Sequence, residues 1–401
     1  MKTKHLLLVS FILLFLLPPV GSYFRWGGMP PGYGLFPAQK VMDDPPFNEP
    51  FFLFCCGVAL FILAFLLFPR LFGFKRVADR DPPVGRAPFP KWFWPGVVVT
   101  LVSWFFMWAR FDVAWKIEHF TFVPLWWGFI TALDGLVYKL NGGASLYANR
   151  PDTVKLMGVV SAFSWFVFEY LNFFVLENWY YPNNEIFTNF GNIAWQLLSY
   201  TTVLPAIFQF YWLLNTNRRL RVRYSRGPRI TVARPVLYLL LVGGYALMVL
   251  MGLFPHALFF VLWLALIPAI VPTMALSGQW NPFTPITQSG NWSFVVLIAL
   301  ATLLNGFFWE FWNFGSEWFH DDMPTNPNYW KYDIPYLNKY YFFSEMPVLG
   351  YFGYLFFGVV CWVLWLTIAY LFNFDPSVGY QPGTDKTSPG SAAAPAAATT
   401  P

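Results

Sequence analysis

Residues 51–69 read FFLFCCGVALFILAFLLFP, an apolar run without a charged side chain. A helix needs about 20 consecutive apolar residues to cross the hydrocarbon core of a bilayer. This stretch therefore predicts a transmembrane helix. Its two cysteines, Cys55 and Cys56, would point about 100° apart on that helix, so we interpret them as small apolar residues and not as a disulfide.

The same pattern recurs along the whole chain. Of its 401 residues, 57% are hydrophobic and only 11% are charged, whereas soluble domains carry about 25% charged residues. The prediction is an all-α, polytopic transmembrane helical bundle of about ten spans. The predicted spans are 6–23, 51–69, 92–109, 120–138, 155–176, 187–213, 235–254, 257–276, 293–314 and 347–373.

The two ends of the chain differ from this pattern. The N-terminal region 1–118 holds three predicted spans, and a basic start before the first span leaves a signal peptide over residues 1–22 as an alternative. The segment 374–401 is rich in Pro, Ala and Thr. Such a composition cannot bury a core, so we expect a disordered tail there.

Basic residues are concentrated in two loops, 70–91 and 218–234. An even number of predicted spans separates these loops, so they lie on one side of the membrane. The positive-inside rule places that side, and with it both termini, in the cytoplasm. There is no basic patch outside these short loops, so we expect no nucleic-acid partner.

An internal duplication is indicated by four matches in the same order along the chain. The pairs are HFTFVPLW at 119–126 with HALFFVLW at 256–263, FEYLNF at 168–173 with WEFWNF at 309–314, Trp179-Tyr-Tyr181 with Trp330-Lys-Tyr332, and LSY at 198–200 with LGY at 349–351. We predict two three-span repeats, spans 4–6 in residues 119–214 and spans 8–10 in residues 256–373. The basic loop and linker span 215–255 separates them. Equivalent spans lie four apart, so the repeats run parallel and share an axis along the membrane normal.

Parallel repeats place equivalent residues at one depth. Glu169 and Glu310 each precede an asparagine by three residues, which puts both polar groups on one helix face. A charged group in a membrane usually faces the bundle interior or a wet cavity. We therefore predict a polar site in the outer leaflet between the repeats. The catalytic candidates are Glu169, Glu310, His119 and His256, and the substrate-binding candidates are Asn172, Asn313, Glu317, Trp179, Trp330 and Tyr332.

Structural interpretations of the same residues stay open. Polar side chains also hydrogen-bond across membrane helices as structural glue, and the two histidines could be interfacial anchors. Asp134 near the inner end of the fourth span is interpreted as an interface residue or an ion-pair partner of Lys139.

The outer loop 315–346 is rich in tyrosine and tryptophan. We expect it to lie back on the bilayer or to cap the bundle, which would suit an amphiphile or a sugar-bearing lipid. Its segment His320-Asp321-Asp322 contains residue types that bind metals, but three adjacent residues are a weak indication of a metal site. We therefore predict no metal, and we also predict no cofactor. Walker A, G-x-G-x-x-G, H-E-x-x-H and G-x-S-x-G patterns are absent from the sequence.

Two segments, Trp309-Glu-Phe-Trp-Asn313 and Glu345-Met-Pro-Val-Leu-Gly-Tyr351, resemble a group of uncharacterised bacterial polytopic membrane proteins. The resemblance covers roughly residues 119–372. It implies a location in the cytoplasmic (inner) membrane and supplies no activity.

The leading hypothesis is a protein that binds or modifies a lipid-like or amphiphilic substrate from the membrane. In an enzyme, Glu169 and Glu310 would act as acid and base, and aromatic walls could stabilise a carbocation by cation–π contact. The alternatives are a proton-coupled secondary transporter and a scaffold subunit of a membrane complex. The sequence identifies no protein partner.

Overall fold

The computed structural model describes residues 2–77, 84–109, 116–318 and 325–378. Its long helices are α1 (Lys2–Trp26), α2 (Glu49–Leu67), α3 (Phe93–Trp108), α4 (Phe122–Leu140), α6 (Pro151–Phe173), α8 (Val203–Thr216), α10 (Arg234–Leu253), α14 (Ser293–Trp318) and α15 (Gly353–Phe372). Shorter helices are α5 (Leu146–Asn149), α7 (Asn189–Tyr200), α9 (Arg218–Arg223), α11 (Val261–Leu264), α12 (Leu266–Leu276) and α13 (Thr284–Ser289). Two short strands, β1 (Trp179–Tyr180) and β2 (Lys331–Tyr332), complete the described part, so the predicted all-α class is confirmed.

Seven helical segments of the described residues are long and apolar enough to cross a membrane, and the chain is an integral membrane protein. They are Lys4–Trp26, Glu49–Leu67, Pro151–Phe173, Asn189–Thr216, Arg234–Leu253, Ser293–Glu317 and Val348–Phe372. Helix also occupies the other three predicted spans, but α3 and the α11–α12 segment are shorter apolar helices. A helix of 16 residues such as α3 rises only about 24 Å, against roughly 30 Å of hydrocarbon. The count of ten spans therefore stays a prediction.

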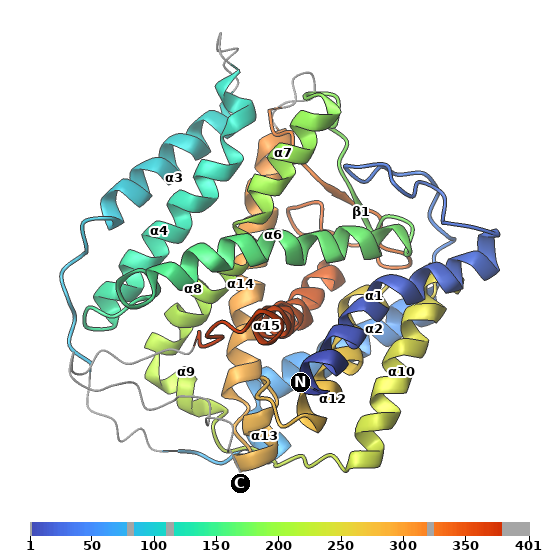
Figure 1. Cartoon of the computed structure of the whole chain (residues 1–401). Helices are drawn as coiled ribbons and strands as arrows, with labels where there is room; N and C mark the ends of the chain where they lie inside the picture. The colour runs from blue at the N-terminus through green and yellow to red at the C-terminus, as the bar shows by residue number, and fades with distance from the viewer. Residues whose placement is uncertain (1, 78–83, 110–115, 319–324, 379–401) are drawn as a thin grey trace.

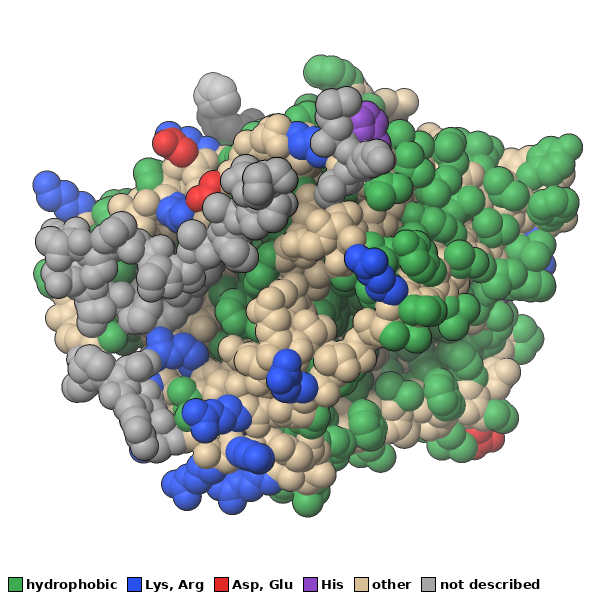
Figure 2. Space-filling model, turned by 60° about the horizontal axis from the view of Figure 1, so that its bottom comes forward, with side chains coloured by type: hydrophobic (Ala, Val, Ile, Leu, Met, Phe, Trp, Pro, Cys, Tyr) green, Lys and Arg blue, Asp and Glu red, His purple; other side chains and the backbone are tan. Residues whose placement is uncertain are grey.

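The helices pack around α14, which contacts α8 and α15, and α6 crosses α8 (Figure 1). The α3–α4 pair flanks one side of this centre, and α1, α10 and α12 pack together on the other. Lys and Arg side chains gather on the face at the bottom of Figure 1, where α9 lies (Figure 2). Hydrophobic side chains dominate the right half of the view in Figure 2.

The sixth predicted span, 187–213, is broken between α7 and α8. Pro205 in the first turn of α8 has no backbone N–H and favours a helix start there. The hydroxyl of Ser161 on α6 donates to the carbonyl oxygen of Tyr200 and accepts from the backbone N–H of Leu204. One buried side chain therefore satisfies backbone groups on both sides of the break.

The segment after α15 is packed as far as residue 378. Arg150 forms an ion pair of 2.8 Å with Asp375. The indole N–H groups of Trp365 and Trp212 donate to the carbonyl oxygens of Pro376 and Val378. Residues 379–401, the rest of the predicted disordered tail, lie outside the described residues.

Close backbone contact joins α3 and α4. A Cβ atom added at Gly128 would lie 2.8 Å from the backbone nitrogen of Thr100 and 3.0 Å from the carbonyl oxygen of Gly96. Small residues allow such an approach between membrane helices. In contrast, a Cβ atom at Gly57, exposed on α2, meets no atom within 4 Å.

We expect Gly128→Leu to destabilise the fold, because α3 and α4 must move apart to admit the side chain. Overpacking of this kind costs about 1–3 kcal/mol, so thermal unfolding of the purified protein in detergent should occur at a lower temperature. Gly57→Leu is the matched control and should unfold close to the wild type. Equal unfolding temperatures for the two variants would contradict the packing argument.

Candidate functional site

Two of the matched sequence segments meet in space. Strand β1 follows α6 and β2 follows α14, and the strands pair antiparallel with Trp179 opposite Tyr332 and Tyr180 opposite Lys331. Segments far apart in the sequence therefore form one small sheet. Side chains from both matched regions are brought to the same place.

Each strand is approached by an asparagine from the preceding helix. The side-chain amide of Asn172 donates to the carbonyl oxygen of Trp179 at 2.9 Å. The amide of Asn313 donates to the carbonyl oxygen of Trp330 at 2.8 Å and accepts from its backbone N–H at 3.0 Å. Both asparagines thus hold the backbone of a tryptophan that forms part of the site.

Glu169 on α6 is buried, and its Oε1 atom accepts four hydrogen bonds from neutral groups. The donors are the indole N–H groups of Trp165 (2.8 Å) and Trp179 (3.1 Å) and the hydroxyls of Tyr181 (2.6 Å) and Tyr200 (3.0 Å). No ion pair within the described part of the chain involves this carboxyl. Hydrogen bonds to aromatic side chains therefore replace a counter-charge.

Glu310 on α14 has the same kind of environment. Its Oε1 atom accepts from the hydroxyls of Tyr332 (2.7 Å) and Tyr354 (2.6 Å). The indole N–H of Trp330 in turn donates to the hydroxyl of Tyr332. In both glutamates the second oxygen, Oε2, is buried without a hydrogen bond.

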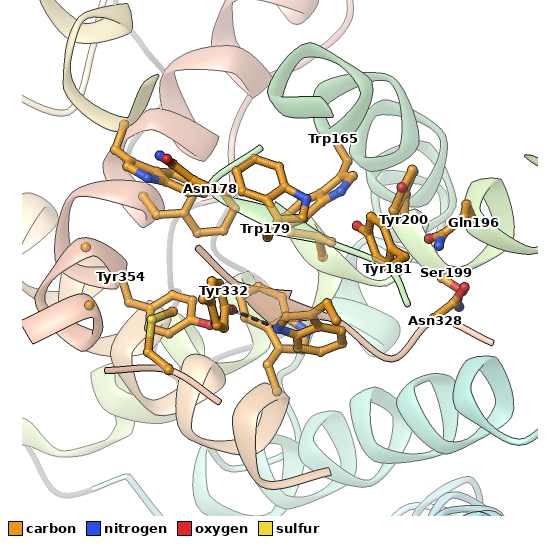
Figure 3. A pocket seen from close by; sticks show the side chains of 18 of the residues that line it. Trp165, Asn178, Trp179, Tyr181, Gln196, Ser199, Tyr200, Asn328, Tyr332 and Tyr354 are labelled. Atoms are coloured by element: carbon orange, nitrogen blue, oxygen red, sulfur yellow. Dashed lines mark hydrogen bonds between the residues drawn. The ribbon is translucent and has the colours of Figure 1, made fainter. Parts of the chain in front are cut away.

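A cavity of about 110 Å³ lies between the two carboxyl clusters (Figure 3). A single water molecule needs roughly 10–15 Å³, so the space is large enough for a small chemical group. The aromatic lining comprises Phe122, Trp165, Trp179, Tyr181, Tyr200, Trp263, Trp309, Trp330, Tyr332, Tyr354 and Phe357. Polar lining comes from Asn178, Gln196, Ser199, Thr202 and Asn328.

Three of the predicted substrate-binding residues, Trp179, Trp330 and Tyr332, line this cavity. Glu169 and Glu310 do not line it, because the tyrosines and tryptophans that donate to them stand between each carboxyl and the space. The carboxyls therefore contact the side chains that line the cavity and not the cavity itself.

The other predicted site residues lie away from the cavity. A ring nitrogen of His119 is 3.1 Å from the carbonyl oxygen of Thr325, and Glu317 accepts from the amide of Asn183 at 2.6 Å. His256 is half-buried in the turn between α10 and α11, where burial lowers its pKa. These three side chains are not brought together with the glutamates.

Several residues of the site were missed by sequence reasoning. Tyr181 and Tyr200 lie inside the matched segments, so those matches were a usable signal. Tyr354 was not matched, yet it takes the place on Glu310 that Tyr200 takes on Glu169. The matched residue Tyr351 instead has its hydroxyl 2.7 Å from that of Ser344. A 3-10 turn over residues 348–352 precedes α15 and changes the register there.

Asp134 is also held by neutral donors, and Lys139 is not its ion-pair partner. Residues five apart on a helix point about 140° apart, and the ammonium of Lys139 lies 3.9 Å from the ring centre of Phe89. The donors to Asp134 are Trp92, Ser145, Tyr147 (backbone) and Gln209.

No site for a metal ion emerges from the described residues, among which no three His, Cys, Asp or Glu side chains are placed to hold one. His320, Asp321 and Asp322 lie outside the described residues.

No family model matches this chain, and no curated protein and no solved structure shows significant similarity to it. The function must therefore be argued from the site itself.

A sharp turn between α6 and β1 carries one further buried acid. Leu176 and Glu177 both adopt left-handed backbone angles, with φ of 59° and 57°. The Glu177 carboxyl is buried without a hydrogen bond to either oxygen. Burial, and to a smaller degree the nearby Asp333, raise its pKa to about 8.

This pKa shift predicts a pH-dependent stability. The folded state favours the protonated acid, so its contribution is complete below the unfolded pKa of about 4.3 and is lost as the pH rises through about 8. Thermal unfolding of the wild type should therefore shift to lower temperature between about pH 5 and about pH 9. Glu177→Gln removes the titration and should reduce this shift, with the larger gain at high pH. Parallel curves for the two proteins would refute the assignment.

Proposed function

We propose that this membrane protein binds or modifies a lipid-like or amphiphilic small molecule in the cavity between Glu169 and Glu310. One observation carries the proposal: the aromatic partners of both carboxyls line the same cavity. Structural glue alone needs no space between the two clusters, whereas a binding site does.

The lining suits a molecule with an apolar body and a small polar group. Its walls are mostly aromatic, and two of its amides have unused hydrogen-bonding atoms. The Nε2 atom of Gln196 and the Oδ1 atom of Asn178 are buried without a partner. Buried polar atoms without partners are unfavourable, so a ligand that bonds to them would be stabilised.

The duplicated arrangement supports the proposal of two related three-helix units. In each half, a helix carries Glu and Asn three residues apart, the Asn holds a tryptophan backbone, and tyrosines cover the Glu. The cavity also contacts Asn328, Trp330 and Ile334 of the loop 315–346. The predicted orientation places this loop outside, which supports a site in the outer leaflet.

An enzyme of this geometry would move protons through its tyrosines. Each glutamate is one hydrogen bond away from a tyrosine hydroxyl of the cavity wall, at 2.6 Å for Tyr181 and 2.7 Å for Tyr332. The carboxyl would then exchange a proton with the ligand through that hydroxyl. This refines the direct acid and base roles expected from the sequence.

Filling the cavity tests the proposal. Gly353 lines the cavity, has a helical backbone, and an added Cβ would meet no atom within 4 Å. Gly353→Leu should therefore occupy the binding space without a clash. Amphiphiles that co-purify with the wild type would be extracted and measured by mass spectrometry. We expect one species to be present at about one molecule per protein in the wild type and to be at least about tenfold less abundant in the variant. A loss of about 1.4 kcal/mol of binding free energy is enough for that reduction.

The control is Gly243→Leu on α10, where an added Cβ also meets open space and which does not line the cavity. It should retain the species. Identical profiles in all three proteins would favour the scaffold alternative, which predicts stoichiometric protein partners instead.

A further inference from the structure

The cavity contains no positively charged side chain, since its lining residues, all of them described, include no Lys, Arg or His. They include five tryptophans and four tyrosines. Two buried carboxyls stand directly behind this aromatic lining. The ionisable groups nearest to this lining are thus acids.

The hydrogen bonds orient the lining in a consistent way. All four tyrosine hydroxyls donate to a carboxyl, Tyr181 and Tyr200 to Glu169, and Tyr332 and Tyr354 to Glu310. Their hydrogen atoms are therefore directed away from a ligand, and the oxygen lone pairs and ring faces remain. Ring faces carry the negative part of the aromatic quadrupole.

Three of the five lining indole groups follow the same rule. The N–H groups of Trp165 and Trp179 also donate to Glu169, and that of Trp330 donates to the hydroxyl of Tyr332. The positive edges of these rings are thus used inside the protein. Apart from the amide N–H of Gln196, these bonded groups leave carbon atoms, lone pairs and ring faces for the ligand, and the lone pairs and ring faces favour positive charge.

We propose that the ligand is an amphiphile with an organic cation as its headgroup, of the alkylammonium class. This inference rests on the proposed function and names its substrate class. Aromatic faces attract a cation within about 6 Å of the ring centre. A bound cation would also supply the counter-charge that the two buried carboxyls lack among the described residues, and would thereby favour their ionised form.

Other ligand classes fit less well. An anion would face two acidic groups. Ca²⁺ and Mg²⁺ need direct oxygen ligands, but the carboxyls are covered by phenols and indoles, and no His or Cys among the described residues lines the cavity for a softer metal ion. A sugar would require many hydrogen-bond partners, whereas among the lining residues the buried side-chain atoms without a partner are Nε2 of Gln196 and Oδ1 of Asn178. A fully alkylated ammonium needs no hydrogen-bond acceptor.

The test compares octyltrimethylammonium with octyl tert-butyl ether, an uncharged compound of similar shape. Isothermal titration would give the dissociation constant of each for the full-length protein in an uncharged maltoside detergent. We expect the cation to bind at least about tenfold more tightly than the ether, a difference of about 1.4 kcal/mol. Gly353→Leu should abolish saturable binding of both.

Glu169→Gln and Glu310→Gln each remove a carboxyl that a bound cation can ionise and keep an acceptor oxygen for the aromatic donors. Each should weaken the binding of the cation about tenfold more than the binding of the ether, and an unfolding temperature close to that of the wild type shows that the variant is folded. Equal affinity of the two compounds, or equal weakening of both in the Gln variants, would overturn the cation assignment and leave the amphiphile site standing. Failure of the wild type to bind either compound would overturn both proposals.

Discussion

The structure depends on buried carboxyl groups that are held by neutral hydrogen-bond donors. Inside an apolar bundle an unsatisfied polar group costs several kcal/mol, so the donors must be in place when the helices pack. Glu169 joins α6 to β1 and α7 in this way, and Glu310 joins α14 to β2 and α15. Asp134 does the same between α4 and α8. The cavity is the space left where the first two of these networks approach each other.

The helices could be predicted from the sequence because the bilayer demands long apolar runs, and each predicted span contains helix. The break between α7 and α8 could not, since it depends on Ser161 of another helix satisfying the backbone at Tyr200 and Leu204. The grouping of several candidate residues could also be predicted. The matching segments pointed to Glu169, Glu310, Trp179, Trp330 and Tyr332, and the structure brings these side chains to the two paired strands and the cavity beside them.

Sequence matches place residues along a helix but do not fix what each side chain contacts. The glutamates therefore lie behind the cavity wall and not in it, and His119 contacts the backbone of Thr325 at the start of the described outer segment. Tyr354, and not the matched Tyr351, donates to Glu310, because a short 3-10 turn precedes α15. These differences depend on tertiary contacts, which a local sequence pattern does not predict.

The pairing of β1 with β2 has a mechanical consequence. The strands act as a cross-brace between the two halves of the chain, and Asn172 and Asn313 anchor the brace at both ends. In many transporters one half rocks as a rigid body against the other. Here such a movement would have to break the pairing of β1 with β2 and expose the backbone groups of both strands. Entry to the cavity without that cost requires a smaller movement. The interruption between α7 and α8 is a suitable place for it, because Tyr200, Thr202 and Val203 line the cavity and the helix is already broken there.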